Sequence, residues 1–280
     1  MTGFSQMTST ISDDEFRLIQ KLIYQQAGIH IKDHKRAMVT NRLRKRLDSF
    51  GFSSYLRYYN FVTRDPGGGK ELAEFINCLT TKETYFFRHS EQFNFLIEVL
   101  LPELRQKKNR ASDRIRIWCA ACSSGEEPYS IAMLVDENLP AAQRRSVEIV
   151  GSDINQCMVD KAQAGVYGPH SMSRTPAAYR QKYFEVNEEG DQFRLSEAIR
   201  KRVNFFRHNL IEPFSHGLFD VIFCRNVLIY FDQESKHKAL GNLHRSLNRD
   251  GHLIIDYALS LFNNQPFFRF RKPTVYQKMS

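Results

Sequence analysis

The stretch WCAACSSGEEPYS at residues 118–130 begins like a buried strand, turns abruptly, and presents two acids at the start of a helix. Dinucleotide-binding folds place a pyrophosphate at such a strand-to-helix turn, with bare glycines and no acid, because helix N-termini attract anions. In this chain Glu126 and Glu127 occupy that place. The pattern therefore predicts a ligand that is cationic or rich in hydroxyl groups, and it argues against a phosphate.

From residue 90 onward, apolar runs alternate with stretches of helical periodicity. The runs are IRIWCAAC, VEIVGSDI, VNFFRHNL, FDVIFCRNV and GHLIIDY, and the helical stretches lie around 90–107, 127–138, 155–164 and 233–248. This alternation is typical of βαβ units and predicts an α/β fold with a mostly parallel, doubly wound sheet. Residues 183–202 break the rhythm and predict a small β insertion, and the final TVYQKMS predicts an antiparallel edge strand.

The first 80 residues differ in character and predict a small all-helical domain. The segment SDDE at 12–15 reads as a capping box, and HKRAMVTNRLRKRLDSFG at 34–51 repeats apolar residues every four positions until a glycine. A DPGGG loop signal then precedes a further helix over about 70–79. We therefore expect a helical N-terminal domain over residues 1–82 and the α/β domain over 83–280.

The composition favours a cytoplasmic globular protein. No apolar run in the 280 residues reaches the length of a membrane span, and the N-terminus lacks the features of a signal peptide. Five cysteines without a regular framework suit a reducing compartment. Cys119 and Cys122 form a CxxC, but no second ligand pair accompanies it, so structural cysteines are favoured over zinc or redox chemistry and we expect no metal.

The net charge of +9 favours an acidic partner, and much of it lies on one predicted helix. This basic cluster consists of Lys35, Arg36, Arg42, Arg44, Lys45 and Arg46. It could be the solvated face of an amphipathic helix. No acid interrupts it before Asp48, however, so its cations repel one another, and we prefer a docking surface for acidic partners.

Polar residues follow four of the predicted strands, at the edge of the sheet where ligands bind in open α/β folds. They are Glu126 after the first strand, Asp153 after the second, Asn209 with Leu210 after the third, and Arg225 with Asn226 after the fourth. Asp153 lies where acids bond ribose hydroxyls, although capping of the next helix is an equal alternative. No GxGxxG follows any strand, which disfavours NAD. S-adenosylmethionine fits better, because it offers a ribose for Asp153 and a cationic amino group and sulfonium for Glu126.

Five segments together resemble the chemotaxis receptor glutamate methyltransferases, the CheR family. They are TTKETYFFR (80–88), SSGEEPYSIA (123–132), GSDIN (151–155), NL (209–210) and FDVIFCRNVLIYF (219–231), and the similarity covers nearly the whole chain. The resemblance implies a Rossmann-like S-adenosylmethionine-dependent methyltransferase sheet with a small β insertion, preceded by an all-helical N-terminal domain. It also implies methyl transfer to glutamate side chains of chemoreceptors, forming glutamyl methyl esters and S-adenosylhomocysteine, for adaptation in bacterial chemotaxis signalling.

The resemblance assigns roles to particular residues. The family's cofactor positions carry over to Thr84, Arg88, Glu126, Asp153, Asn209, Leu210, Arg225 and Asn226. Lys82 departs from the family's TTNxT pattern, which has Asn there, and a cation would disfavour the sulfonium if its side chain pointed inward. We keep Lys82 as a cofactor contact to be tested. Arg88 and Tyr230 are the expected catalytic residues, as a clamp for the acceptor carboxylate and as a hydrogen-bond donor or channel wall. The alternatives are a surface cation and a packed aromatic ring.

The expected partners are the acidic methylation helices of membrane chemoreceptors, together with a receptor C-terminal tail peptide that the β insertion grips in some relatives. We expect a monomer that is recruited from the cytoplasm to receptor arrays at the inner membrane and has no nucleic-acid partner. A nucleic-acid methyltransferase would suit the basic charge, but the Asn/Asp-Pro-Pro-aromatic motif of amino-methylating enzymes is missing after the fourth strand. Intact Arg88, Asp153 and Tyr230 argue against a non-catalytic S-adenosylmethionine-binding adaptor.

Overall fold

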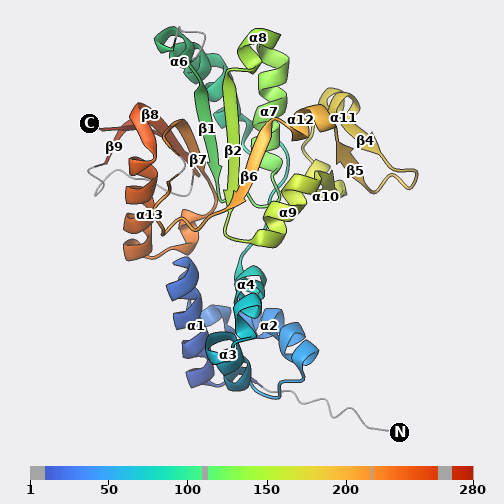
Figure 1. Cartoon of the computed structure of the whole chain (residues 1–280), viewed down its shortest axis with the longest axis vertical. Coiled ribbons are helices and arrows are strands. Elements are labelled where there is room, and N and C mark those ends of the chain that lie inside the picture. The colour runs from blue at the N-terminus through green and yellow to red at the C-terminus, as the bar shows by residue number, and fades with distance from the viewer. Residues whose placement is uncertain (1–9, 109–112, 216, 258–266, 280) are drawn as a thin grey trace. The chain divides into compact units, whose positions relative to one another are not determined.

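The computed structural model describes residues 10–108, 113–215, 217–257 and 267–279, and the chain divides into two compact units (Figure 1). The helical unit comprises Met1–Thr81 and Tyr230–Asp232, and the α/β unit comprises Lys82–Ile229 and Gln233–Ser280. No helix in the described ranges has the length and apolar character that crossing a membrane requires.

The helical unit contains α1 (Asp13–Ala27), η1 (Asp33–Lys35), α2 (Arg36–Phe50), α3 (Tyr55–Arg64) and α4 (Gly68–Leu79). The expected capping box is present, because the Ser12 hydroxyl accepts from the Glu15 amide while the Glu15 carboxylate accepts from the Ser12 amide. Helix α3 was not expected from the sequence. Helix α4 begins within the expected loop, at Gly68, where a Cβ atom would lie 2.1 Å from the carbonyl oxygen of Phe61. Only glycine therefore permits this close approach of α4 to α3.

Part of the basic cluster on η1 and α2 makes contacts within the helical unit. Three of its six cations bind groups of this unit: Arg36 the carboxylate of Asp13, Arg42 the carbonyl oxygens of Leu79 and Thr80, and Arg46 the carboxylate of Glu71. Arg44 and Lys45 are exposed. Half of the six cations thus help to hold the helices together, and the docking surface predicted for the basic cluster stays a prediction.

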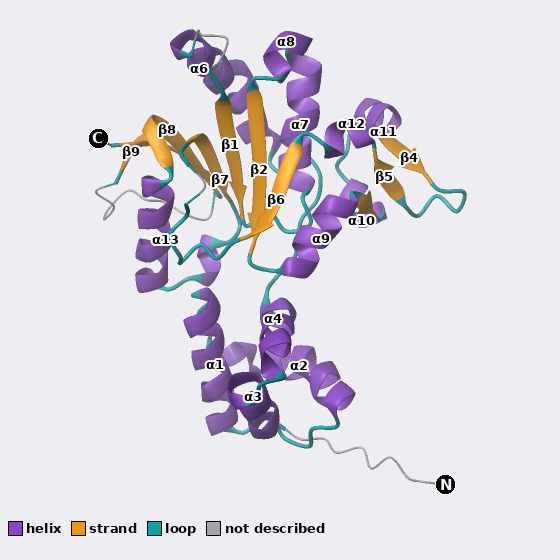
Figure 2. Cartoon of the chain, in the orientation of Figure 1, coloured by secondary structure: helices purple, strands orange, loops and turns teal. Residues whose placement is uncertain are grey.

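The α/β unit is built on a seven-stranded sheet with the order β6-β2-β1-β7-β8-β10-β9 (Figure 2). The five expected strands are present and pair in parallel: β1 (Ile115–Ala120), β2 (Val147–Asp153), β6 (Val203–Arg207), β7 (Phe219–Cys224) and β8 (Leu247–Ile255). The last strand, β10 (Val275–Lys278), is antiparallel as expected, but it lies between β8 and β9 (Phe268–Lys272). The edge position predicted for it was wrong, because the charged segment FRFRK of β9 pairs through its backbone and takes the edge.

Helices precede and connect the parallel strands, as the alternating pattern predicts. They are α5 (Ser90–Phe95), η2 (Leu96–Leu100), α6 (Leu101–Lys107), α7 (Glu126–Asn138), α8 (Ala141–Arg144), α9 (Gln156–Ala164), η3 (Leu228–Tyr230) and α13 (Gln233–Arg245). Helix α7 packs against β1, β2 and β6, and α13 packs against β8. The carboxyl end of β1 thus leads directly into the start of α7.

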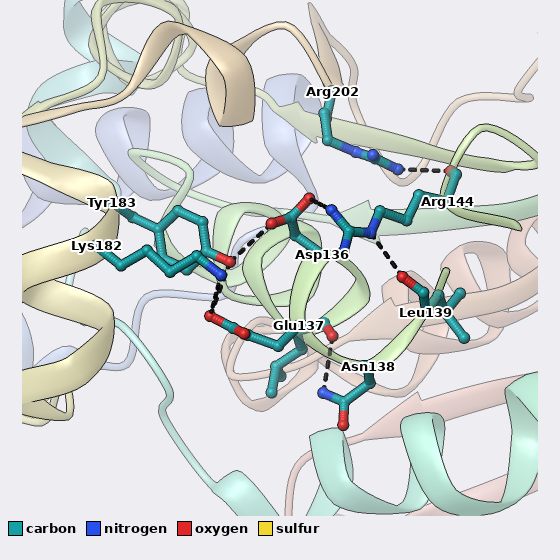
Figure 3. A network of polar contacts seen from close by, with 9 residues as sticks. Asp136, Glu137, Asn138, Leu139, Arg144, Lys182, Tyr183 and Arg202 are labelled. Atoms are coloured by element: carbon teal, nitrogen blue, oxygen red, sulfur yellow. Dashed lines mark hydrogen bonds and ion pairs between the residues drawn. The ribbon is translucent and has the colours of Figure 1, made fainter. Parts of the chain in front are cut away.

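The β insertion is a three-stranded antiparallel sheet of β3 (Val166–Tyr167), β5 (Phe193–Leu195) and β4 (Phe184–Val186), with α10 (Pro169–Met172), α11 (Ala177–Tyr183) and α12 (Glu197–Arg200). Strand β3 adds to the hairpin expected within residues 183–202. Figure 3 shows α11 held at the C-terminal part of α7: the Tyr183 hydroxyl donates to Asp136 and Glu137, both at 2.9 Å, and Lys182 pairs with Glu137 at 2.9 Å. The insertion is therefore fixed to a helix of the main sheet.

Candidate functional site

The candidate site lies where the strand order of the sheet reverses, between β1 and β7. In open α/β sheets, ligands bind outside the carboxyl ends of strands at this point. The backbone there is unusually strained: left-handed φ angles occur at Phe87 and His89, at Ala121 and Ser123 after β1, and at Asn226 after β7. Such conformations are costly for residues with a side chain and cluster at functional sites.

Asp153 ends β2 and fixes the loop that follows β1. Its Oδ2 atom accepts from the amide of Ser123 at 2.8 Å, and its Oδ1 atom accepts from the amide of Asn155 at 2.9 Å. The cap of α9 is Asn155, whose side chain accepts from the amide of Met158. Burial raises the pKa of Asp153, against the lowering effect of these hydrogen bonds and of Lys82. Each carboxylate oxygen can accept a further hydrogen bond, so Asp153 retains capacity for a hydroxyl ligand.

Glu126 begins α7 and is almost completely buried, with 1% of its surface exposed. Its carboxylate accepts from the hydroxyl of Ser124 at 2.9 Å and from that of Ser171 at 2.8 Å. No cation of the described ranges forms an ion pair with it. Burial raises the pKa of Glu126, against the lowering effect of the serine hydroxyls. A carboxylate in this state is suited to bind a cationic ligand group.

The segment of residues 82–89 carries three of the predicted site residues. Lys82 is exposed, and its charge lowers the pKa of Asp153, so the two groups interact electrostatically. Thr84 is half-buried. Arg88 is also half-buried; it donates from Nη1 to the carbonyl of Glu83 at 2.8 Å, and its guanidinium carbon lies 5.5 Å from the ring centroid of Tyr85. Its Nε atom is buried without a hydrogen-bond partner among the described residues.

Arg225 follows β7, and its side chain turns toward protein groups. Nε donates to Glu127 Oε2 at 2.5 Å, and Nη1 donates to the carbonyl of Arg88 at 2.8 Å and to Gln92 Oε1 at 2.6 Å. The guanidinium carbon also lies 4.9 Å from the ring centroid of Phe93. The guanidinium is thus directed to α5 and α7, and its contact with a cofactor stays a prediction.

The remaining strand-end residues are held in turns. The amide of Asn226 donates to the carboxylate of buried Asp256 at 3.1 Å. The amide of Ile211 donates to Asn209 Oδ1 at 3.4 Å, and the carbonyl of buried Leu210 accepts from Asn242 at 2.9 Å.

Tyr230 belongs to the helical unit, where its carbonyl accepts from the amide of His30 at 2.8 Å. Nothing in the α/β unit by itself tests a catalytic role for this residue, which stays a prediction. No group of three or more histidine, cysteine or acidic side chains that could hold a metal ion occurs within the ranges that the structure describes.

Sequence reasoning singled out Glu127 together with Glu126 but did not predict its pairing with Arg225, and it missed three further residues of this region: Gln92, Ser171 and Asp256. Asp256 follows a predicted strand and was therefore accessible to the same rule that found Asp153. Glu127 and Gln92 are joined to Arg225 by hydrogen bonds, although they lie 98 and 133 residues away in the chain. Ser171 donates to Glu126 from the insertion. No local sequence pattern predicts contacts between residues so far apart in the chain.

Comparison with known proteins gives a consistent result over both units. Residues 82–277 match the family model described as CheR methyltransferase, SAM binding domain, and residues 14–80 match CheR methyltransferase, all-alpha domain. Chemotaxis protein methyltransferase 2 of Vibrio cholerae is 36% identical over 274 residues, covering 96% of this chain and 94% of the relative. The chemotaxis protein methyltransferase of Escherichia coli K12 is 37% identical over 277 residues, covering 97% and 93%.

Among solved structures, a magnesium protoporphyrin IX methyltransferase from Synechocystis with bound S-adenosylhomocysteine covers 60% of this chain and 54% of its own. Its identity is 17% and its TM-score 0.34, a similarity too weak to support an argument.

Proposed function

The chain belongs to the CheR methyltransferase family, and we propose that it transfers a methyl group from S-adenosylmethionine to glutamate side chains of chemoreceptors. The products are glutamyl methyl esters and S-adenosylhomocysteine, and the reaction serves adaptation in chemotaxis. The single observation that carries the proposal is Glu126, a buried carboxylate at the switch point of the sheet whose partners are hydroxyl groups.

The residues of the site fit S-adenosylmethionine. Its cationic amino group suits Glu126, which is buried without a cation paired to it in the described structure, and its ribose suits the free acceptor capacity of Asp153. Thr84, Asn209, Leu210 and Asn226 complete the proposed cofactor residues. When bound, the cofactor supplies an activated methyl group on a sulfonium.

For Lys82 we propose an indirect role at the cofactor site. Its ammonium group interacts with the Asp153 carboxylate and favours its ionised form. An ionised Asp153 is the stronger acceptor for ribose hydroxyls.

The acceptor needs orientation more than activation. A glutamate side chain has an ordinary pKa of about 4.3 and is already ionised at neutral pH, so no general base is required. We propose that Arg88 orients the acceptor carboxylate. In support, its guanidinium contacts the carbonyl of Glu83 and the ring of Tyr85, and its Nε has no hydrogen-bond partner among the described residues. Tyr230 is the second proposed catalytic residue, as a hydrogen-bond donor or a wall of the methyl channel.

For receptor recognition we propose a narrower basic surface than the whole cluster. Arg44 and Lys45 are exposed on α2, and they would attract the acidic methylation helices of receptors. The β insertion is the proposed site for a receptor tail peptide. We further propose a monomer in the cytoplasm that is recruited to receptor arrays.

The decisive experiment uses the full chain, radiolabelled S-adenosylmethionine and bacterial membranes that contain chemoreceptors. Methyl esters release volatile methanol in mild alkali, so we expect label to move from the receptor band into the vapour phase. Arg88→Ala should lower turnover by a factor of about 10² to 10³, as loss of one preorganised donor often does. Label that resists alkali, or label found in nucleic acid, would contradict the proposal and support a nucleic-acid or amine methyltransferase.

A further inference from the structure

The segment that carries Arg88 has no regular structure, so its course depends on the elements around it. Residues 81–85 are neither helix nor strand, and residues 86–89 form a turn in which Phe87 and His89 are left-handed. At residues 86–88, three contacts from other parts of the described structure hold the backbone: Phe86 N to the carbonyl of Ser171 (3.0 Å), Phe87 N to Ser130 Oγ (2.9 Å), and Arg225 Nη1 to the carbonyl of Arg88 (2.8 Å). Only the last of these acts directly on Arg88.

The contact from Arg225 belongs to a buried group of hydrogen-bonded side chains, Arg225, Glu127 and Gln92, which we call the fork. The same guanidinium binds Glu127 at 2.5 Å and Gln92 at 2.6 Å, and the side chains of Arg225 and Glu127 are only 3% and 10% exposed. A planar guanidinium can serve three acceptors in fixed directions, whereas a lysine ammonium in the same place is a flexible point charge. Glu127 balances the buried charge, so the fork does not require a ligand to be stable.

The fork joins the two loops of the switch point to the Arg88 segment. Arg225 directly follows β7, and Glu127 is the second residue of α7, immediately beyond the loop that follows β1. Gln92, on α5, in turn donates from Nε2 to the carbonyl of Ile255, the last residue of β8. This group of side chains therefore links the backbone of Arg88 to the ends of three neighbouring strands, β1, β7 and β8.

We propose that Glu127, Arg225 and Gln92 form a positioning group that sets the backbone of Arg88 for methyl transfer without touching cofactor or acceptor. This inference rests on the proposed function, in which Arg88 orients the acceptor carboxylate. It gives the Arg225 side chain a role other than the cofactor contact that the family resemblance implies.

The first test is Arg225→Lys, which retains the charge beside Glu127 but loses the fork. We expect kcat to fall about tenfold or more, because small misplacement of a catalytic group is costly, while the affinity for S-adenosylhomocysteine in calorimetry stays within about twofold. Arg271→Lys is the matched control, since Arg271 also binds a carboxylate, Glu103, and an imidazole, His252, at the sheet edge. The control should leave kcat unchanged.

A double-mutant cycle tests whether Arg225 acts through Arg88. In an Arg88→Ala background, Arg225→Lys should lower kcat less than about twofold, because the group being positioned is already absent. Equal losses in both backgrounds would overturn the proposal, as would a parallel loss of cofactor affinity and kcat in the single variant.

If Arg225→Lys does not fold, Glu127→Leu with Arg225→Met replaces the ion pair by apolar groups of similar size, a change that proteins often tolerate. This variant should fold, bind S-adenosylhomocysteine and lose turnover; wild-type kcat would overturn the positioning role. Failure of the proposed function would be distinct, because the wild-type chain would then form no alkali-labile esters.

Discussion

Replacing Glu126 by glutamine should weaken cofactor binding and stabilise the ligand-free protein at the same time. The carboxylate is 1% exposed, and its hydrogen bonds come from two serine hydroxyls. Glutamine preserves its shape and one acceptor oxygen but removes the charge. Losing a buried, charge-assisted contact to the cofactor's amino group should cost about 1.5–3 kcal/mol, or about 10- to 100-fold in Kd for S-adenosylhomocysteine.

The stability effect has the opposite sign. Because burial raises the pKa of Glu126, the folded protein holds the ionised form less readily than the unfolded chain does. This cost is absent well below the ordinary glutamate pKa, grows as the pH rises toward the raised value, and is fully present above it. At neutral pH the glutamine variant should therefore have the higher Tm in the absence of ligand.

Calorimetry with S-adenosylhomocysteine between pH 5 and pH 8, together with thermal unfolding, checks both effects. Wild-type affinity should fall as the pH is lowered and Glu126 takes up a proton, and the variant should show a weaker dependence, because of the two carboxylates only Asp153 then remains to titrate. Ser171→Ala is the matched control, because it removes one hydroxyl partner and keeps the charge. Equal affinities of wild type and Glu126→Gln would refute the assignment of Glu126 to the amino group.

Reversing the charges of Arg44 and Lys45 to glutamate should raise KM for receptor and weaken its salt dependence, without changing the affinity for S-adenosylhomocysteine; an unchanged rate at low salt would make this a solvated face. Burial, reinforced by the charge of Arg271, lowers the pKa of His252 from 6.5 to about 4. As the pH falls, the unfolded chain therefore binds the proton before the folded protein does. The free energy of unfolding should consequently fall by about 3 kcal/mol between pH 6.5 and pH 4. Chemical denaturation of wild type and His252→Gln across this range measures it, and parallel curves would exclude the histidine. Gly68→Ala should destabilise the protein by more than about 1 kcal/mol, whereas Gly69→Ala, whose Cβ meets nothing within 4 Å, should stabilise it by up to about 1 kcal/mol; similar Tm values would contradict the close helix approach.

The parallel strands and the helices between them were predictable, because burial on both faces produces long apolar runs that local reading detects. Strand β9 was not predicted, because FRFRK carries three charges and its pairing is determined by the backbone of β10. Helix α3 was not predicted, because its buried residues are mostly tyrosines, which are also common in strands.

Within the site, Asp153, Arg225 and Asn226 were predicted from their position at strand ends, whereas Asp256, which follows β8 in the same way, was not. The pairing of Arg225 with Glu127 and Gln92 was not predicted, because these residues lie 98 and 133 positions away in the chain and meet Arg225 only after the sheet has formed. The same holds for the hydroxyl that Ser171 directs to Glu126. Chemistry that depends on a strand end can be read from sequence, whereas chemistry that depends on tertiary pairing cannot.

The β insertion shares its apolar interior with the main sheet. Tyr167 and Phe184 of the insertion pack edge-on against the ring of Phe86, and all three belong to the same buried cluster as Ile117 of β1. Excising the insertion would therefore open the core of the α/β unit to water. In hydrogen exchange, the amides of β5 should become labile together with those of the central strands, because the two parts form one cooperative unfolding unit.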